Sequence, residues 1–219
     1  LAMLGLSGGR SELYVLGLAG CLLHVWNHSL FKSLLFLGAG AVVDATGTRV
    51  IDRLGGLATS MPWTAAFFVI GAVAICGLPP LNGFVSELLV YLGLFNGLSS
   101  GSAAAGASGG VAAVAMAAPV LAMIGALALA CFVKASGAVF LGNARSPRAG
   151  RAKEAPLAML LPMAGLAAIC LLIGLVPWML TPILDAVIAG WWPSAGAAAA
   201  AAGSDALPGI GALPNLGSM

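Results

Sequence analysis

Long apolar runs separated by short polar stretches dominate this chain. A helix needs about 20 consecutive apolar residues to cross a bilayer, and four runs reach or approach that length. These runs are residues 13–40, 61–98, 111–141 and 156–177. The pattern therefore predicts an all-α, polytopic bundle of transmembrane helices over residues 13–177. The intervening stretches, residues 41–60, 99–110 and 143–155, are predicted to be loops, and residues 99–110 a Gly/Ser/Ala linker.

The second run is interrupted by the sequence GLPPLNG at residues 77–83. Pro79 and Pro80 remove two backbone donors and crowd the preceding carbonyls, so a helix that begins near Met61 should end near Gly77. Asn82 and Gly83 then suit a turn and the start of a new helix. Non-helical backbone at membrane depth is tolerated only where protein buries it or where it lines a wet cavity. The sequence thus predicts one discontinuous helix, with an ion site at the break.

The alternative is that residues 61–98 form two separate spans joined by an ordinary loop. Charge placement argues for one broken crossing. With one crossing, the loops 41–60 and 143–155 lie on the same side and carry six of the nine basic residues. With two crossings they lie on opposite sides, against the positive-inside rule. We therefore predict a multi-pass membrane protein with both loops in the cytoplasm.

The ends of the chain differ from the bundle. Residues 178–192 are short for a span and carry tryptophans at both ends, which is typical of an interfacial segment. Residues 193–219 are Ala/Gly/Pro-rich and low in complexity, which indicates a linker. We expect residues 1–12 to be the stub of a truncated preceding helix and loop, and the chain to be part of a larger protein.

Composition supports a membrane protein and excludes several functions. Apolar residues make up 61% of the chain and charged residues 7%, with a mean hydropathy of +1.07, whereas soluble domains carry about 25% charge. The net charge of +2 gives no support to a nucleic-acid partner. No nucleotide-binding motif is present. The four cysteines stand singly, without a CxxC pair, so we expect no zinc or iron–sulfur site and no other cofactor. These are Cys21, Cys76, Cys131 and Cys170.

Three titratable residues recur along the first span. His24, His28 and Lys32 are spaced i, i+4, i+8, which places them on one face of a helix over about 12 Å. Ionisable groups are rare inside membranes and commonly mark proton relays, so this stripe is a candidate proton path. The structural alternative is that the histidines are hydrogen-bonded core residues and that Lys32 extends to the interface.

Two further charges complete the candidate path. Glu87 is predicted to lie in the first turn of the helix after the break, where a carboxylate could be an ordinary cap. Lys134 is predicted to lie about ten residues inside the basic loop, where it could either relay protons or extend to the interface. Without partners, Lys32, Glu87 and Lys134 together would cost roughly 8–10 kcal/mol at membrane depth. They must therefore be paired, hydrated or neutral part of the time.

Several segments resemble the antiporter-like membrane subunits of respiratory complex I, Mrp-type Na⁺/H⁺ antiporters and membrane-bound hydrogenases. The first segment is HVWNHSLFKSLLFLGAG at residues 24–40. The segments LGGLATSMPWTA at residues 54–65 and GLPPLNGFVSE at residues 77–87 are most similar to hydrogenase-4 component B and formate hydrogenlyase subunit 3. The segment FVKASGAVFLG at residues 132–142 fits the same branch. The resemblance covers about residues 13–176.

That resemblance implies a fold and a set of site residues. The family has two inverted five-helix repeats, each with a broken helix, and this chain would supply most of the second repeat. Glu87 falls where the family carries a Lys or Glu at its second broken helix. His24, His28 and Lys32 match the family's hydrophilic stripe, and Lys134 matches the helix that follows.

The sequence therefore predicts a membrane subunit that translocates protons within a hydrogenase-4 or formate hydrogenlyase type of complex. It would do no redox chemistry itself, so we expect no catalytic residue. The resemblance implies a location in the bacterial inner membrane. The partners would be other membrane subunits, peripheral hydrogenase or formate dehydrogenase subunits, and lipid, and the ion would be the proton, with Na⁺ as the alternative. The alternatives are the equivalent subunit of an Mrp antiporter or of complex I, and a passive scaffold that anchors redox subunits.

Overall fold

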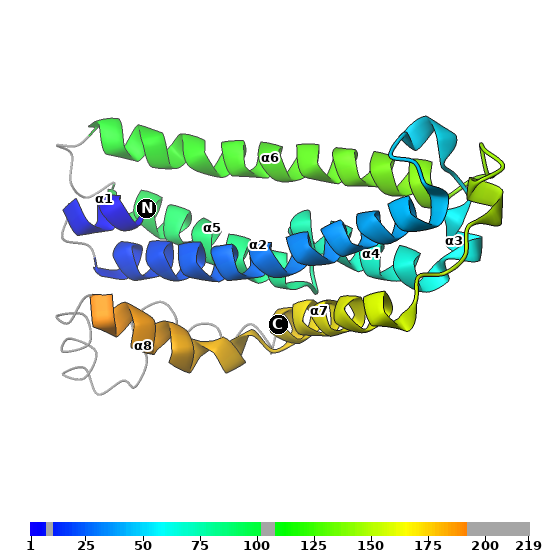
Figure 1. Ribbon diagram of the computed structural model, residues 1–219. Helices are drawn as coiled ribbons and strands as arrows, with labels where there is room; N and C mark the ends of the chain where they lie inside the picture. The colour runs from blue at the N-terminus through cyan, green and yellow to red at the C-terminus, as the bar shows by residue number, and fades with distance from the viewer. Residues whose placement is uncertain (8–10, 102–107, 192–219) are drawn as a thin grey trace.

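The computed structural model describes residues 1–7, 11–101 and 108–191, and every regular element within these ranges is a helix (Figure 1). The α-helices are α1 (Ala2–Ser7), α2 (Ser11–Thr46), α3 (Leu57–Ser60), α4 (Pro62–Ile75), α5 (Asn82–Gly101), α6 (Ser108–Phe140), α7 (Leu157–Leu175) and α8 (Thr181–Trp191). Short 3-10 helices lie at Ile51–Arg53, Ala149–Arg151 and Pro177–Leu180. The predicted all-α transmembrane bundle is confirmed.

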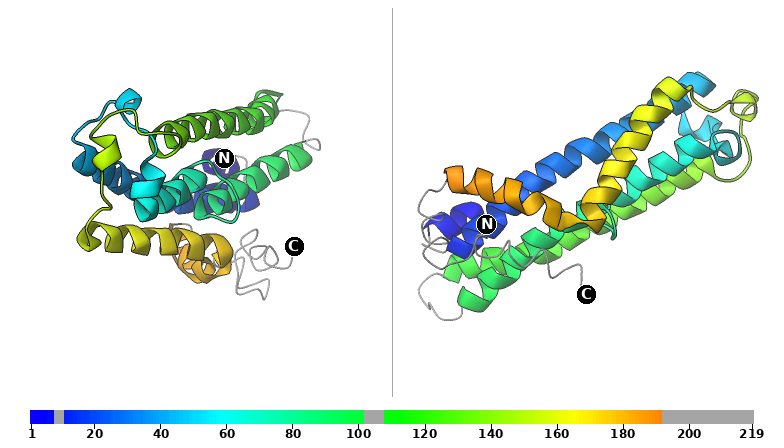
Figure 2. Two further views of the ribbon diagram at one scale, coloured as in Figure 1. Left: turned by 90° about the vertical axis from the view of Figure 1, so that its right-hand side faces the viewer. Right: turned by 90° about the horizontal axis from the view of Figure 1, so that it is seen from below.

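Helix α2 runs the length of the bundle and packs against both α4 and α5. Its N-terminal half shares a buried cluster with α5, in which Val15 and Leu16 accompany Leu89. Its C-terminal end shares another with α4, in which Ala41 accompanies Ala65. Figures 1 and 2 show α4 and α5 following each other along α2. The two short helices are therefore the two halves of one discontinuous helix, as the sequence predicts.

The break occupies residues 76–81, between the end of α4 and the start of α5. Gly77 adopts φ +64°, a left-handed conformation that glycine accepts easily, and its N–H donates to the Ala74 carbonyl over 3.2 Å. The Pro79–Pro80 peptide bond is cis. A Cβ added at Gly174 of α7 would lie 2.7 Å from the Leu81 Cα, so α7 packs directly on the break because it has no side chain there.

One local prediction about the break is confirmed and another is wrong. A new helix does start at Asn82 and Gly83, which are the first two residues of α5, and the turn lies before them. Consequently Glu87 is the sixth residue of α5 and does not lie in its first turn, which contains no acidic residue. The helix starts immediately after Pro80 and Leu81, because proline restricts the chain before it far more than the chain after it.

The linker predicted at residues 99–110 is shorter than expected, because helices occupy both of its ends. Helix α5 continues to Gly101, and α6 begins at Ser108. Only residues 102–107 of that segment lie outside the described residues. The small residues of this stretch can form helix. They are less apolar than the neighbouring runs, so a prediction based on apolar runs did not extend the two helices into it.

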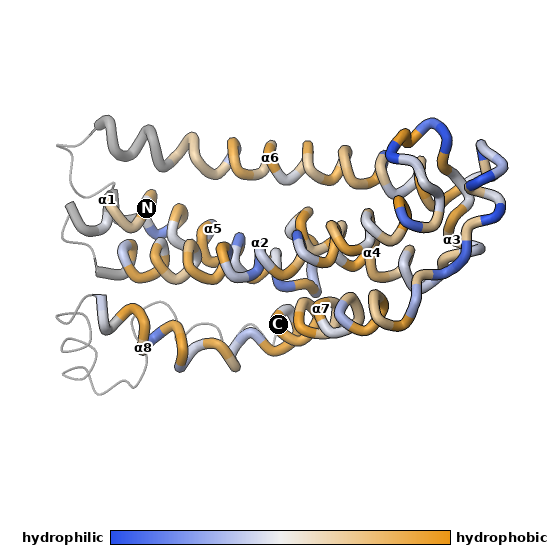
Figure 3. The backbone as a smooth tube through the Cα atoms, in the orientation of Figure 1, coloured by the Kyte–Doolittle hydropathy of each residue, from blue (hydrophilic) through white to orange (hydrophobic). Residues whose placement is uncertain are grey.

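Both basic loops lie at the same end of the bundle. Leu54 and Leu57 of the first loop share a buried cluster with Ala149 and Ala152 of the second. The Gly56 N–H also donates to the Leu141 carbonyl over 2.9 Å. Figure 3 shows the hydrophilic positions gathered at this end of the bundle. The common end agrees with a single crossing by α4 and α5.

Glu154 joins the second loop to the start of α4. Its carboxylate accepts hydrogen bonds from the Trp63 backbone N–H over 2.8 Å and from the Thr64 hydroxyl over 2.6 Å. Helix α4 opens with Pro62, which lacks an N–H, and its N-cap residue makes no side-chain bond. A residue about 90 positions away therefore satisfies the free donors at the start of this helix.

Helices α6 and α7 each pack against both halves of the discontinuous helix, whereas α8 packs against α2. Residues Leu13–Thr46, Ala115–Phe140 and Leu157–Leu175 are long and apolar enough to cross a membrane. Helix α8, which belongs to the segment predicted to be interfacial, lies beside the N-terminal half of α2, and its Leu184 and Ile188 are buried there. Its interfacial position stays a prediction.

Candidate functional site

Polar side chains meet at mid-length in the bundle, where α2 passes the break. His24 lies 3.1 Å from Ser86 of α5, measured from its Nδ1 to the serine Oγ. The Ser86 hydroxyl donates to the Gly83 carbonyl over 2.9 Å, so its hydrogen is already used. The histidine must then donate from Nδ1, which assigns its hydrogen to that nitrogen and leaves Nε2 as an acceptor.

Two asparagines form a second connection between α2 and the start of α5. The Asn27 amide donates to the Asn82 carbonyl over 2.8 Å, and the Asn82 amide donates to the Asn27 Oδ1 over 3.1 Å. Both residues are fully buried. Buried amides are costly unless they are bonded, so this reciprocal pair fixes the first residue of α5 against α2.

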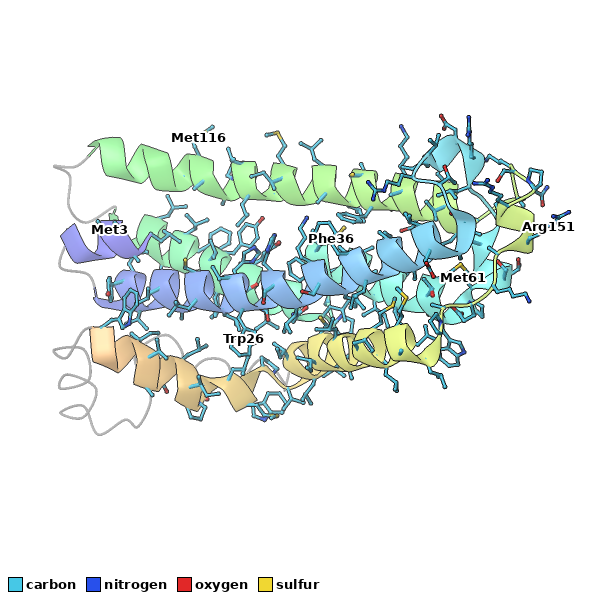
Figure 4. The ribbon with its side chains drawn as sticks, in the orientation of Figure 1. Met3, Trp26, Phe36, Met61, Met116 and Arg151 are labelled. Atoms are coloured by element: carbon cyan, nitrogen blue, oxygen red, sulfur yellow. The ribbon has the colours of Figure 1, made fainter. Side chains whose placement is uncertain are left out.

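The other two residues of the stripe are less enclosed. The ring centroids of His24 and His28 are 6.1 Å apart, and Phe31 packs edge-on against His28 with a centroid distance of 5.3 Å. His28 is exposed and Lys32 is half-buried. Neither makes a hydrogen bond or ion pair with any residue that the structure describes. Figure 4 shows the same helix carrying Trp26 toward α7 and α8 and Phe36 toward α6.

Glu87 faces a different part of the bundle. It lines a cavity of about 280 Å³ between the break, α5 and α6, together with Gly77, Tyr91 and the stretch of α6 from Leu121 to Leu129. Since a water molecule takes about 30 Å³ in the liquid, this cavity has room for several. Within the described ranges, the half-buried Glu87 carboxylate makes no hydrogen bond and no ion pair. It is also the only acidic side chain among the described residues that line the cavity.

The structure brings some predicted site residues together and separates others. Gly77 and Glu87 share the cavity, but His24, His28, Lys32 and Lys134 do not line it. Lys134 is exposed on α6, five residues beyond Leu129, which places it about 7.5 Å closer to the loop end. The described residues contain no group of three His, Cys, Asp or Glu side chains that could hold a metal ion.

Comparison with known proteins agrees with this architecture. Residues 11–112 match the family described as NADH:quinone oxidoreductase/Mrp antiporter, TM. Hydrogenase-4 component B of Escherichia coli (strain K12) is 46% identical over 182 residues, which are 83% of this chain and 26% of that protein. Formate hydrogenlyase subunit 3 of the same strain is 41% identical over 196 residues, covering 86% of this chain and 31% of that protein. The chain is a homologue of the antiporter-like membrane subunits.

More distant relatives lie in the same family. Na⁺/H⁺ antiporter subunit A1 of Staphylococcus haemolyticus (strain JCSC1435) is 34% identical over 182 residues, covering 80% of this chain and 21% of that protein. A chain in the structure of the Mrp complex from Dietzia sp. DQ12-45-1b superposes with a TM-score of 0.59 at 22% identity, covering 76% of this chain and 36% of its own length. That likeness shows the fold. This antiporter-like chain spans between a quarter and a third of the two Escherichia coli relatives.

Three residues of this candidate site were missed by sequence reasoning. Ser86 was passed over beside the more conspicuous Glu87, although a hydroxyl one position earlier faces a different neighbour on a helix. Gly174 belongs to α7, about 90 residues from the break, and only the fold shows that it touches Leu81. Asn27 lies within the stripe segment, where its amide could have been recognised as a partner for Asn82.

Proposed function

We propose that this chain forms an ion-conducting part of the membrane subunit of a hydrogenase-4 or formate hydrogenlyase type of complex. Its ion would be the proton, and redox chemistry would take place on peripheral hydrogenase or formate dehydrogenase subunits. The identities of 46% and 41% to two such subunits support this branch over an Mrp antiporter, for which the corresponding value is 34%. The inner membrane of a bacterium is the proposed location.

The proposal rests on one observation, which is that the Glu87 carboxylate faces a cavity and bonds to no other described residue. An ionised side chain at membrane depth costs about 2.5–3.5 kcal/mol even on the lenient scale, so a structural carboxylate should be paired. Glu87 has no partner among the described residues and faces a cavity with room for water. A capping role does not account for it, because it lies beyond the first turn of α5. A carboxylate in this setting can take up and release a proton without breaking any bond of the fold.

The stripe on α2 would supply protons to this carboxylate. Protons would pass between Lys32, His28 and His24, because the two imidazoles are neighbours and each can both accept and donate. Ser86 accepts from His24 and immediately precedes Glu87 on α5. The remaining step would run around α5 through water at the break, and Lys134 would extend the path toward the loop end.

A scaffold function has one observation in its favour. The bonds of His24 to Ser86 and of Asn27 to Asn82 are internal bridges of the kind that a scaffold needs. Glu87 discriminates between the two functions, since a scaffold gives an unbonded carboxylate no task.

The test is Glu87→Gln in the full-length subunit of the assembled complex. Glutamine keeps the size and hydrogen-bonding geometry but does not titrate. We expect normal assembly with proton translocation into sealed vesicles reduced at least tenfold, and Glu87→Asp to be intermediate because its carboxylate reaches less far. Translocation equal to that of the parent would refute an ion-carrying role for Glu87.

We also propose that the end of the bundle with the two basic loops faces the cytoplasm, since six of the nine basic residues lie in these loops. Single cysteines at the exposed positions Val50 and Ala144, in a background without native cysteines, should label only from the cytoplasmic side. Labelling from the outer side would show that the orientation is the reverse of the proposed one.

A further inference from the structure

Gly77 and Glu87 are in direct contact across the break. A Cβ built on Gly77 would lie 2.7 Å from the Glu87 Cδ and 2.9 Å from its Oε1, and it would overlap Oε2. Real Cβ atoms essentially never approach other heavy atoms this closely. The carboxylate therefore occupies the space that any side chain at position 77 would need.

Backbone conformation alone does not explain this glycine. Gly142, at the end of α6, also has a positive φ, +76°, but a Cβ added there would meet nothing within 4 Å. Gly142 is therefore needed only for the left-handed backbone, which a Cβ disfavours. Gly77 has φ +64° and faces the carboxylate as well. Comparing the two glycines therefore distinguishes the need for a left-handed backbone, which both share, from the need for space beside the carboxylate, which applies to Gly77.

The contact also sets where the carboxylate can lie. Glu87 is carried by α5, whereas Gly77 follows the last turn of α4, so the carboxylate bridges the two halves of the discontinuous helix. Both residues line the cavity against α6. A methyl group at position 77 would push the carboxylate away from the break, while the side chain stays attached to an unchanged α5.

We propose that Gly77 is a positioning residue, which holds the Glu87 carboxylate against the end of α4 at the mouth of the cavity. This inference rests on the proposed ion-carrying function of Glu87. In this arrangement the break shapes the path in two ways, since it interrupts the helix and its glycine fixes where the proton-carrying group lies. Small movements of residues 76–81 would shift the carboxylate with them.

The experiment compares Gly77→Ala with Gly142→Ala in the full-length subunit within its complex. Both variants meet the same backbone penalty, but only Gly77→Ala displaces the carboxylate. We expect Gly77→Ala to lower proton translocation at least tenfold per assembled complex, and Gly142→Ala to stay within about twofold of the parent. Equal translocation by the two variants would overturn the proposal.

A rescue variant tests whether the effect acts through Glu87. In Gly77→Ala/Glu87→Asp, the carboxylate is one methylene shorter and clears the added methyl group. We expect this double variant to translocate several-fold faster than Gly77→Ala alone and about as fast as Glu87→Asp. Absence of rescue, with Glu87→Gln itself impaired, would mean that Gly77 acts through the backbone, and the positioning role would be wrong.

Two controls distinguish a failure of this proposal from a failure of the proposed function and from a loss of assembly. If Glu87→Gln translocates like the parent, the proposed function fails, whatever Gly77→Ala does. If Gly77→Ala does not assemble, Gly77→Ala/Glu87→Ala removes the whole carboxylate and should restore assembly to the level of Glu87→Ala. Continued loss of assembly in that variant would show that the space beside Glu87 is not the reason for the glycine.

Discussion

The two sides of α5 next to the break carry different kinds of polar residue. Toward α2, Asn82 and Ser86 are fully buried and bonded to Asn27 and His24. Toward α6, Glu87 is half-buried, faces a cavity and has no hydrogen bond or ion pair within the described part of the chain. The first six residues of α5 thus present a bonded side and an unbonded side.

This difference distinguishes polar groups that hold helices together from a polar group that is free to change its charge. A bonded amide or hydroxyl away from water cannot leave its partner without losing about 1–3 kcal/mol, so it holds the helices in register. An unbonded carboxylate beside a cavity can change its charge without disturbing that register. Polar residues at one depth can therefore have different roles, since the Asn27–Asn82 pair holds the helices in register and Glu87 can change its charge.

The largest effect should follow from breaking the bonded side. Asn27→Ala removes two hydrogen bonds and leaves the buried Asn82 side-chain amide without the acceptor for its NH₂ group, while the Asn82 carbonyl keeps its bond within α5. At about 1–3 kcal/mol for each unsatisfied group, we expect a clear loss of assembled subunit, measured by its level in membranes. Asn27→Asp keeps the size and one acceptor and should lose less. Normal assembly of Asn27→Ala would show that the pair does not hold α5.

The second effect should be slower transport by a subunit that assembles normally. His28→Ala and Lys32→Met remove groups that make no hydrogen bond or ion pair within the described ranges, so we expect normal subunit levels. If the stripe relays protons, each change should slow translocation about tenfold, which corresponds to about 1.4 kcal/mol. Vesicle acidification per unit of assembled complex measures this. Loss of assembly together with transport would instead support the scaffold.

The smallest effect should come from Ser86→Ala. It removes two neutral hydrogen bonds, the one from His24 and the one to the Gly83 carbonyl of its own helix, and bonds between helices average about 0.6 kcal/mol in a membrane protein. We expect nearly normal assembly and a translocation rate within a few-fold of the parent, because water can replace the hydroxyl. Ser86→Val would be a sharper test, since it fills the space as well. A complete block by Ser86→Ala would make the hydroxyl an obligatory step.

Most of the fold followed from the sequence, because long apolar runs and paired prolines act locally. The discontinuous helix and the common end of the two loops needed only span lengths and charge placement. The position of Glu87 in α5 was wrong by about a turn, since the first residue of a helix depends on what it packs against. The contacts of Glu154 and Gly174 were out of reach, because each joins segments that are distant in sequence.

The site followed from the sequence only in part. The spacing of His24, His28 and Lys32 fixes their common face, whatever surrounds it. Which neighbour each group meets depends on how α5 is rotated about its axis, and no local pattern sets that rotation. For this reason Glu87 could be expected at the break, but its cavity and its contact with Gly77 could not.

The most direct test asks whether Glu87 changes its protonation as the complex works. Infrared difference spectroscopy on the assembled complex during turnover would detect the stretch of a protonated carboxyl group, and Glu87→Gln would assign it. The account predicts a carboxyl band that rises and falls with turnover and is missing in Glu87→Gln, while the amide bands of the helices stay the same. A parent complex that translocates protons with no carboxyl band dependent on Glu87 would contradict it.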